Sequence, residues 1–514
     1  MTTNTPNQTV HLNTPPEVEM QAMAGTEPEQ GATGAKRSEE NPRLPGRPKQ
    51  QLDRYLNFIA SLAFSTTLLA SWETVGGSLL AGLYNGGPSA IVYGLIVSIV
   101  GNLAIALSLA ELASVHPTAG AQYHWTYVFS WSALVCIAPF FIGTQMEGLI
   151  ILANPTYTPH RWHGTLLMWA VSIIPIVTNV FARRLLSGIE LAAGVMHVAF
   201  LPIFIGVVAG LAPARSADGF VWDTLVSGLS GWKGDGLVFS IGLLGVITPF
   251  AGIDGIIHMS EEVHNAPRAI PRSMIWGTVI NGIMAFGYTL CILYYMGPYL
   301  SAVVTPTSYP IIEIAYQATG GSVRGTALLM ALGMLPGWTA FFNALASVTR
   351  LVWAFARDEG LPFSGVFVRV HETLRVPVRA LGLVSAVVVL LSFIPVASTA
   401  AFNAILSLST LGLYTSYLFP LGFLVGKRVF GAPGDVPKGQ FSMGRWGLVV
   451  NMVAILVAMY FSLFLPFPPT VPITMENMNY AGPVLGLVML FACVDWVLRG
   501  RYRWTGPTME YARG

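Results

Sequence analysis

The stretch Ser71-Trp72-Glu73-Thr74-Val75-Gly76-Gly77 decides the fold, because it puts one carboxylate and two glycines inside a long apolar run. A second stretch, Thr248-Pro249-Phe250-Ala251-Gly252-Ile253-Asp254-Gly255, interrupts another apolar run in the same way. Each stretch opens a block of five apolar runs, so the second block has inverted topology. Glycine-interrupted helices at corresponding positions of two halves indicate a transporter binding site. The alternative is that the glycines only let helices pack closely.

The chain carries too little charge to be a water-soluble protein. Of its 514 residues, 53% are apolar and 10% are charged, whereas a soluble domain has about 25% charged residues. This composition argues against a soluble enzyme, a nucleic-acid binder and a disordered scaffold. The net charge of +2 indicates no polyanionic partner. The three cysteines, Cys136, Cys291 and Cys493, lie in apolar stretches, which excludes a disulfide framework and a cysteine-rich zinc site.

Twelve apolar runs are long enough to span a membrane as helices. About 20 apolar residues are needed for a helix, unpaired backbone groups are too costly in lipid, and the alternation of a membrane barrel is absent. The predicted helices are 55–83, 88–113, 127–151, 164–182, 187–212, 237–260, 273–297, 323–354, 379–396, 401–426, 444–466 and 480–499. They form a transporter domain over 55–499, with repeat one at 55–212, repeat two at 237–426 and the last two helices at 444–499.

Both ends of the chain are predicted to lie in the cytoplasm. Residues 1–54 form a tail too poor in large apolar residues to fold, so it is expected to be disordered. It has no apolar core near its start, so it is not expected to be a cleaved signal peptide. Of 27 Lys and Arg residues, only four fall on the side opposite the N-terminus: Arg161, Arg215, Lys233 and Arg324. The positive-inside rule therefore places 1–54 and the C-terminal tail 500–514 inside.

The two interrupted helices are predicted to bind the substrate. Half-helix N-termini offer N–H groups to an anion and half-helix C-termini offer carbonyls to a cation, so a zwitterion uses both. The predicted substrate-binding residues are Ser71, Trp72, Glu73, Thr74, Gly76, Gly77, Pro249, Phe250, Ala251, Gly252 and Asp254. The expected partners are a small zwitterionic or cationic substrate, protons and the lipid bilayer. No cofactor, metal or nucleic acid is expected.

The end of the second apolar run carries a family signature. It reads Ala110-Glu111-Leu112-Ala113-Ser114-Val115-His116-Pro117-Thr118-Ala119-Gly120-Ala121-Gln122-Tyr123-His124-Trp125. Other agreeing stretches are Asn85-Gly86-Gly87-Pro88, 161–167, 258–263, 270–272 and 357–362. Over about residues 50–500 the chain thus resembles the amino acid–polyamine–organocation superfamily, more narrowly its fungal branch of amino acid, GABA and choline permeases. The resemblance implies an all-α leucine-transporter fold with two inverted five-helix repeats, alternating access and proton symport at the plasma membrane.

One departure from the family pattern lies between Ser130 and Trp131. The family usually has a longer cytoplasmic link there, followed by a full third helix. Here the link from the second helix has about a dozen residues and no Lys or Arg. Because the third helix borders the substrate path in this fold, an inactive product with a shortened third helix is one alternative function. A non-transporting nutrient sensor of the same fold is another.

Three ionisable residues within predicted spans are candidates for binding or coupling. Alignment on 85–87 puts Glu73 at the family's unwound substrate-contact turn, where it is expected to hold a substrate ammonium or accept the coupling proton. Alternatively, a neutral Glu73 donates to a carbonyl of the broken helix. His197 lies where several proton-coupled relatives place a lysine and titrates near neutral pH, or it is only bonded within the bundle. Asp254 faces the inner vestibule or caps the second half-helix.

Charged residues at cytoplasmic helix ends form a predicted inner gate. They are Glu111, Glu261, Glu262, Arg268, Arg272 and Arg350. The alternative is a set of interfacial salt bridges. Asp495 and Arg499 are four residues apart and are expected to pair structurally.

Further residues are candidates for lining the cavity. Glu147 is expected to reach the membrane interface, or else to line the outer vestibule. Trp338, Asn343, Phe402 and Asn403 are weaker candidates, since aromatic residues suit a cationic ligand but are more often packing residues.

The sequence therefore predicts a multi-pass plasma-membrane transporter of the fold described above. It is expected to import a small amino acid, GABA or a choline-like amine by proton symport. Glu73 and His197 are the predicted proton-coupling residues. No nucleophile–base set is found, so the chain is not expected to be an enzyme.

Overall fold

The computed structural model describes residues 52, 54–120, 125–397, 399–432, 436–475 and 477–504. All of them belong to one compact unit, Pro48–Gly514. Twelve helical segments in this part of the chain are long and apolar enough to cross a membrane, which confirms the predicted number of spans. The predicted tails 1–54 and 500–514 lie almost entirely outside the described residues.

The first block holds five spans. The first consists of α1 (Phe58–Leu69) and α2 (Ser71–Tyr84), and the second is α3 (Gly87–Val115). The third consists of α4 (Trp125–Leu134) and α5 (Ile137–Ala153), followed by α6 (Arg161–Phe181) and α7 (Arg183–Leu211). The third span has 28 residues, Thr126–Ala153, so the short link before it does not shorten the span itself.

The second block also holds five spans. Its first is divided into α9 (Asp235–Gly242), α10 (Leu244–Ile247), η1 (Thr248–Phe250) and η2 (Gly255–Met259). The others are α11 (Ala266–Tyr294), α14 (Val323–Arg357), α16 (Val378–Ser392) with α17 (Ile394–Ala397), and α18 (Thr399–Phe430). The last two spans are built around α19 (Gly447–Phe464) and α20 (Ala481–Asp495), with η3 (Gly444–Trp446), η4 (Trp496–Gly500) and α21 (Arg501–Arg503) at their ends. Short helices in the connections are α8 (Asp218–Trp222), α12 (Tyr299–Val303), α13 (Pro310–Ala318) and α15 (Ser364–Phe367).

The first span breaks at Ala70, before the glycines that were predicted to interrupt it. Ala70 adopts a left-handed conformation (φ 41°, ψ 49°), and α2 then runs unbroken through Gly76 and Gly77. Asn281 of α11 takes the place of the lost helical bonds, because its amide donates to Thr66 O (2.9 Å) and accepts from Ser71 N–H (3.2 Å). The predicted position of the break was therefore wrong.

Gly76 and Gly77 instead permit close helix packing, as the alternative interpretation held. A Cβ atom at Gly76 would lie 2.7 Å from the Tyr288 hydroxyl, and one at Gly77 would lie 3.2 Å from the Phe141 ring. Small residues at such contacts let helices approach closely in a membrane.

The second break follows η1. The backbone is extended at Ala251, turns at Gly252 with a positive φ of 94°, and resumes as the 3₁₀ segment η2. A side chain at Gly252 would meet both a left-handed backbone cost and the Trp131 ring at 3.1 Å. Asp254 occupies the N-cap position of η2 but its side chain makes no capping hydrogen bond, so the capping alternative is not what the structure shows.

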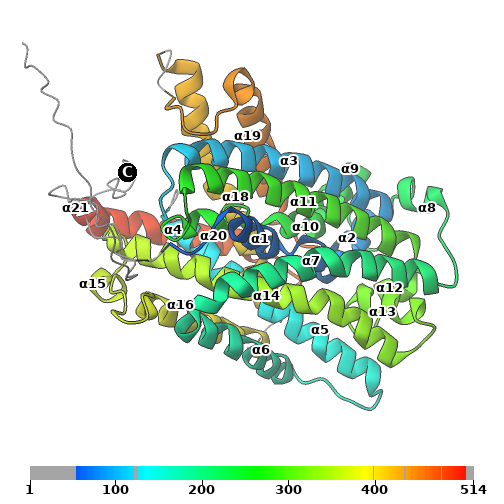
Figure 1. Cartoon of the computed structure of the whole chain (residues 1–514). Coiled ribbons are helices and arrows are strands. Elements are labelled where there is room, and N and C mark those ends of the chain that lie inside the picture. The colour runs from blue at the N-terminus through cyan, green and yellow to red at the C-terminus, as the bar shows by residue number, and fades with distance from the viewer. Residues whose placement is uncertain are drawn as a thin grey trace, which may run out of the picture. The chain divides into compact units, whose positions relative to one another are not determined.

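Both broken spans are enclosed by other helices. The buried share of the apolar window is 67% in each, against 11% in the last span. The segment α11 packs against α3, α1 and α2, while α14 packs against α1, α5, α6 and α7. Figure 1 shows α3 and α11 side by side. Irregular backbone at membrane depth is tolerated only where protein or a cavity surrounds it, and the two breaks meet that condition.

The seventh span differs most from its predicted bounds. It begins at Ala266 rather than at residue 273, because Pro267 occupies the first helical turn, where a proline is well tolerated, and a second proline, Pro271, is accommodated inside the helix.

Candidate functional site

A small cavity of about 90 Å³ lies beside the first break. It is lined by Ala70, Trp72, Glu73, Thr74 and Gly76 of the first span, and Thr248 and Ala251 come from the second break. Phe141 and Gln145 of α5 and Gly333 and Gly337 of α14 also line it. Residues of the two breaks thus meet at one cavity, as the inverted-repeat argument predicts, and its volume suits a small ligand.

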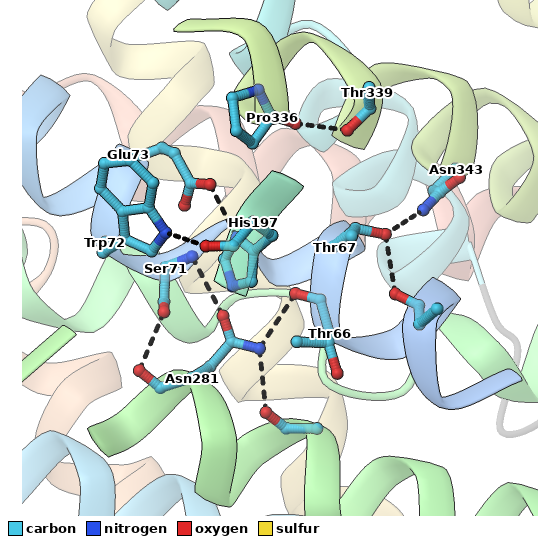
Figure 2. A network of polar contacts seen from close by, with 12 residues as sticks. Thr66, Thr67, Ser71, Trp72, Glu73, His197, Asn281, Pro336, Thr339 and Asn343 are labelled. Carbon is cyan, nitrogen blue, oxygen red and sulfur yellow. Dashed lines mark hydrogen bonds and ion pairs between the residues drawn. The ribbon is translucent and has the colours of Figure 1, made fainter. Parts of the chain in front are cut away.

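Glu73 and His197 face each other at this cavity. His197 Nδ1 lies 2.7 Å from Glu73 Oε1, and their side chains are 0% and 6% exposed respectively. The Trp72 indole donates to the His197 carbonyl (3.2 Å), which fixes the histidine backbone against α2 (Figure 2). Sequence reasoning singled out both residues, but it did not predict that they touch.

Each member of this pair keeps one unused polar atom. Glu73 Oε2 and His197 Nε2 are buried without a hydrogen-bond partner among the described atoms. A buried acceptor left unpaired costs about 1–3 kcal/mol, and more when charged. Because Glu73 lines the cavity, a cationic group that enters it would supply the missing donor. The alternative of a neutral Glu73 bonded to a helix carbonyl is not what the structure shows.

The surroundings of Trp72 hold the first turn of α2 in place. Its ring packs against Phe204 and Tyr288, with centroids 6.1 and 5.3 Å away. On the other side, a Cβ atom at Gly333 would lie 3.4 Å from Trp72, and one at Gly337 would lie 3.7 Å from Glu73. The two α14 glycines therefore let α14 approach the site closely.

Several predicted substrate-binding residues lie away from this cavity. Ser71 is buried and donates from its hydroxyl to the Asn281 carbonyl (3.0 Å). Gly77 lines the larger cavity instead. Pro249 and Phe250 are buried in η1, and Gly252 packs against Trp131.

Asp254 belongs to a buried polar cluster. It accepts hydrogen bonds from the hydroxyls of Tyr127 and Tyr417, the latter at 2.7 Å. Tyr127 also contacts His258 Nε2 (2.8 Å), and His258 Nδ1 lies 2.8 Å from the Ala119 carbonyl. This cluster joins the second break to α4 and α18. No local sequence pattern predicts this cluster, since its members are far apart along the chain.

Three ion pairs gather at one end of the bundle, which we call the arginine-rich end. Arg350 holds Glu262 through two hydrogen bonds (3.0 and 3.2 Å), and both side chains are at most 1% exposed. Arg357 pairs with Glu261 (2.5 Å), and Arg428 pairs with Glu111. Of the predicted gate residues, Arg268 and Arg272 are exposed on α11 and take no part in these pairs.

The arginine-rich end is also tied to the start of α1. The backbone N–H groups of Tyr55 and Leu56 both donate to the Glu262 carbonyl at 3.0 Å. Burial raises the pKa of Tyr55, and the nearby Glu262 raises it further. Burial likewise raises the pKa of Glu261, although Arg357 acts in the opposite direction. These contacts close the end of the bundle on which α1 begins.

The opposite end contains a larger cavity of about 760 Å³. Glu147 lines it, which agrees with the vestibule alternative rather than the interface one. Ile137, Phe141 and Thr248 line both this cavity and the small one. The candidate site therefore borders a hollow at one end and buried ion pairs at the other.

The remaining predicted residues have other surroundings. The Trp338 indole donates to the Val171 carbonyl (2.8 Å), and Asn343 donates to Thr67 (2.7 Å), so neither lines the small cavity. The side chains of Phe402 and Asn403 lie outside the described part of the structure. Asp495 and Arg499 form the expected pair (2.8 Å).

One buried carboxylate, Glu190 of α7, was missed. It is 2% exposed and lies within a predicted span, the same signal that identified Glu73.

The chain is similar to known membrane transport proteins. A family model described as amino acid permease matches residues 56–490. A candidate amino acid/polyamine transporter of Macrophomina phaseolina is 30% identical over 82% of this chain and 96% of its own length. The choline transporter of Saccharomyces cerevisiae is 28% identical over 84% of this chain and 79% of its own. Amino-acid permease 2 of Neurospora crassa is 26% identical, with coverages of 90% and 87%.

Proposed function

Because the chain belongs to the amino acid permease family, we propose that it imports a small amino acid, GABA or a choline-like amine by proton symport with alternating access. The named relatives include amino acid permeases and a choline transporter. These names leave the choice of substrate to the chemistry of the site.

The observation that carries the proposal is the unused oxygen of Glu73. An ammonium group in the cavity donates to Glu73 Oε2, while Oε1 keeps its contact with His197. Hydrogen bonds to charged groups contribute about 1.5–3 kcal/mol. The Asn281 amide oxygen takes only the Ser71 N–H, so the next N–H groups of the first turn of α2 and the helix dipole favour a carboxylate near the same place. A zwitterionic amino acid satisfies both features.

A choline-like amine would bind through a different part of the site. Its quaternary ammonium has no N–H group that could donate to Glu73, and the molecule has no carboxylate that could accept from the N–H groups of α2. It would instead lie between the negative charge of Glu73 and the aromatic rings of Trp72 and Phe141, which line the cavity, by cation–π attraction.

Proton coupling is assigned to the Glu73–His197 pair. A proton on His197 Nδ1 donates to Glu73 Oε1, and a second proton, on Nε2, would make the histidine a cation. Gain or loss of this second proton changes the net charge of the pair that a substrate meets. Coupling then requires that the proton and the substrate each bind one access state more tightly than the other.

Access is proposed to alternate between the two ends of the bundle. The larger cavity faces the cell exterior and the arginine-rich end faces the cytoplasm, in accord with the positive-inside rule. In this state the ion pairs of Glu111, Glu261 and Glu262 hold the cytoplasmic end shut. Inward opening must separate at least some of these pairs.

Uptake in a host without its own amine and amino acid permeases tests the proposal. Labelled GABA, choline and a mixed amino acid set are offered at acid and at neutral external pH. The expected result is uptake of one substrate that increases at acid pH and is lost in Glu73→Gln. Glu313→Gln is the matched control, because Glu313 lies on α13 bonded to Gln317 (2.8 Å). Correct surface expression without uptake of any substrate would refute transport of these compounds and favour a sensor.

A further inference from the structure

Two arginines at the start of α11, Arg268 and Arg272, have positive charges that nothing in the described part of the chain neutralises. Both side chains are exposed, and neither takes part in the ion pairs found at the arginine-rich end. The two glutamates that precede them in the chain, Glu261 and Glu262, are engaged by other arginines. The proposed gate therefore leaves these two charges unused.

The position of the two arginines in α11 adds to their need for an anion. They lie in the first two turns of the helix, where the helix dipole favours anions and disfavours cations. The first turn holds no acidic residue, and Asn265 at the N-cap makes no side-chain capping hydrogen bond. An anion from outside the chain would compensate this excess of positive charge.

The exposed face of α11 continues from the arginines into apolar side chains. Trp276 lies four residues after Arg272 and is 55% exposed, and Ile283 lies seven residues further and is 69% exposed. With 3.6 residues per turn, Arg268, Arg272, Trp276 and Ile283 fall within about 80° around the helix. We call these four residues the α11 stripe.

The α11 stripe points away from the bundle. Gly277 lies on the opposite face of the helix from Arg268, and a Cβ atom there would lie 2.7 Å from the Ser65 hydroxyl oxygen of α1. Between the exposed positions, Ala269, Ile270, Ser273 and Met274 are buried. The face that carries the stripe is therefore open to the surroundings of the protein, and in a span it faces lipid.

The order of side chains along the stripe matches the layers of a membrane leaflet. At 1.5 Å per residue, Trp276 lies about 6 Å and Ile283 about 16 Å beyond Arg272 along the helix. Tryptophan concentrates at the level of the lipid head groups, and apolar side chains face the acyl chains. Arginines beside the head groups attract anionic lipids, and the guanidinium group matches the geometry of a phosphate.

We propose that the α11 stripe binds an anionic phospholipid. Its phosphate contacts Arg268 and Arg272, and an acyl chain lies along Trp276 and Ile283. A soluble anion would meet the two arginines but would leave the apolar half of the stripe uncovered, so the stripe as a whole fits a lipid. This site neutralises the positive charge at the start of α11 and requires no transport activity, so it stands apart from the proposed function.

Native mass spectrometry of the purified full-length protein tests this site. The delipidated protein in detergent is titrated with phosphatidylglycerol and, separately, with phosphatidylcholine of the same acyl chains, and the affinity for the first bound lipid is measured. One arginine beside an anionic lipid contributes about fivefold, so the wild type should prefer phosphatidylglycerol about 25-fold. Replacing both arginines by glutamine should abolish this preference, whereas replacing both by lysine should retain most of it.

Two further variants show where and what the lipid contacts. Arg324→Gln is the matched control, because Arg324 is also exposed and lies in the first turn of another long helix, α14; it should keep the wild-type preference. Trp276→Gln should weaken the binding of both lipids, because the indole contacts the apolar part that they share.

Three results would overturn the proposal. The first is equal affinity of the wild type for the two lipids. The second is a preference that survives in the double glutamine variant or is lost equally in Arg324→Gln, since the preference would then not come from the α11 stripe. The third is unchanged binding of both lipids in Trp276→Gln, which would assign the arginines to a soluble anion instead.

Discussion

Removing the charge of Glu262 should open the arginine-rich end of the bundle. Glu262 and Arg350 are fully buried and joined by two hydrogen bonds. Truncating one partner of a buried ion pair costs about 3–5 kcal/mol, because the other charge is left uncompensated. If this cost falls on the closed state alone, the ratio of open to closed protein increases by a factor of about 10² to a few times 10³, since each 1.4 kcal/mol is tenfold.

The shift can be measured as the reactivity of a thiol placed behind the pair. Ser260 is 4% exposed and its hydroxyl is buried without a partner, so Ser260→Cys reports opening from the cytoplasmic side. The assay uses Cys493→Ser, because Cys493 is exposed whereas Cys136 and Cys291 are buried. In nanodiscs, a water-soluble maleimide should label residue 260 about 10²-fold or more faster after Glu262→Gln.

Two controls separate opening from general damage. Glu261→Gln breaks a pair whose side chains are 14% and 8% exposed, and Arg357 keeps a contact with Asp358 (3.5 Å), so labelling should increase less than after Glu262→Gln. Replacing both Glu262 and Arg350 by methionine removes the pair without leaving a bare charge and should restore protection. Equal labelling in Glu262→Gln and the parent, or a larger effect of Glu261→Gln, would refute the reasoning.

Two further predictions concern packing and pH. Gly76→Ala would place a methyl group 2.7 Å from the Tyr288 hydroxyl, whereas the methyl group of Gly188→Ala would meet nothing within 4 Å. Because overpacking costs about 1–3 kcal/mol, only Gly76→Ala should lower the midpoint of thermal unfolding. Equal midpoints of the two variants would contradict the packing around Gly76. Because burial raises the pKa of Glu261 despite Arg357, the folded state holds its proton to higher pH than the unfolded state, and stability decreases as pH rises from about 4.3. The stability advantage of wild type over Glu261→Gln should therefore shrink with pH, and a widening advantage would show that attraction to Arg357 outweighs burial.

The spans could be predicted because apolar run length alone determines them. All twelve were located from the sequence, and α14 ends three residues from its predicted bound. The first break was misplaced because its cause is tertiary. Asn281, 210 residues from Ser71 in the chain, stabilises the left-handed turn at Ala70, and no local pattern around residue 70 reveals it.

The site could be predicted in its components but not in its contacts. Their positions within spans, together with the family resemblance, were enough to single out Glu73 and His197, yet their 2.7 Å contact depends on how α7 packs against α2. Arg357 and Arg428 were missed as gate residues, since charged residues at helix ends offer many alternative pairings. Glu190 could have been found, because it carries the same signal as Glu73.

Equilibrium binding of labelled substrate to purified protein tests the central claim most directly, namely that Glu73 holds the amine of the substrate. Loss of a hydrogen bond to a charged group costs about 1.5–3 kcal/mol, so Glu73→Gln should weaken binding about 10- to 150-fold. Glu313→Gln should bind like the wild type. A folded Glu73→Gln protein that binds substrate within twofold of the wild-type affinity would contradict the claim and leave Glu73 as a partner of His197 only.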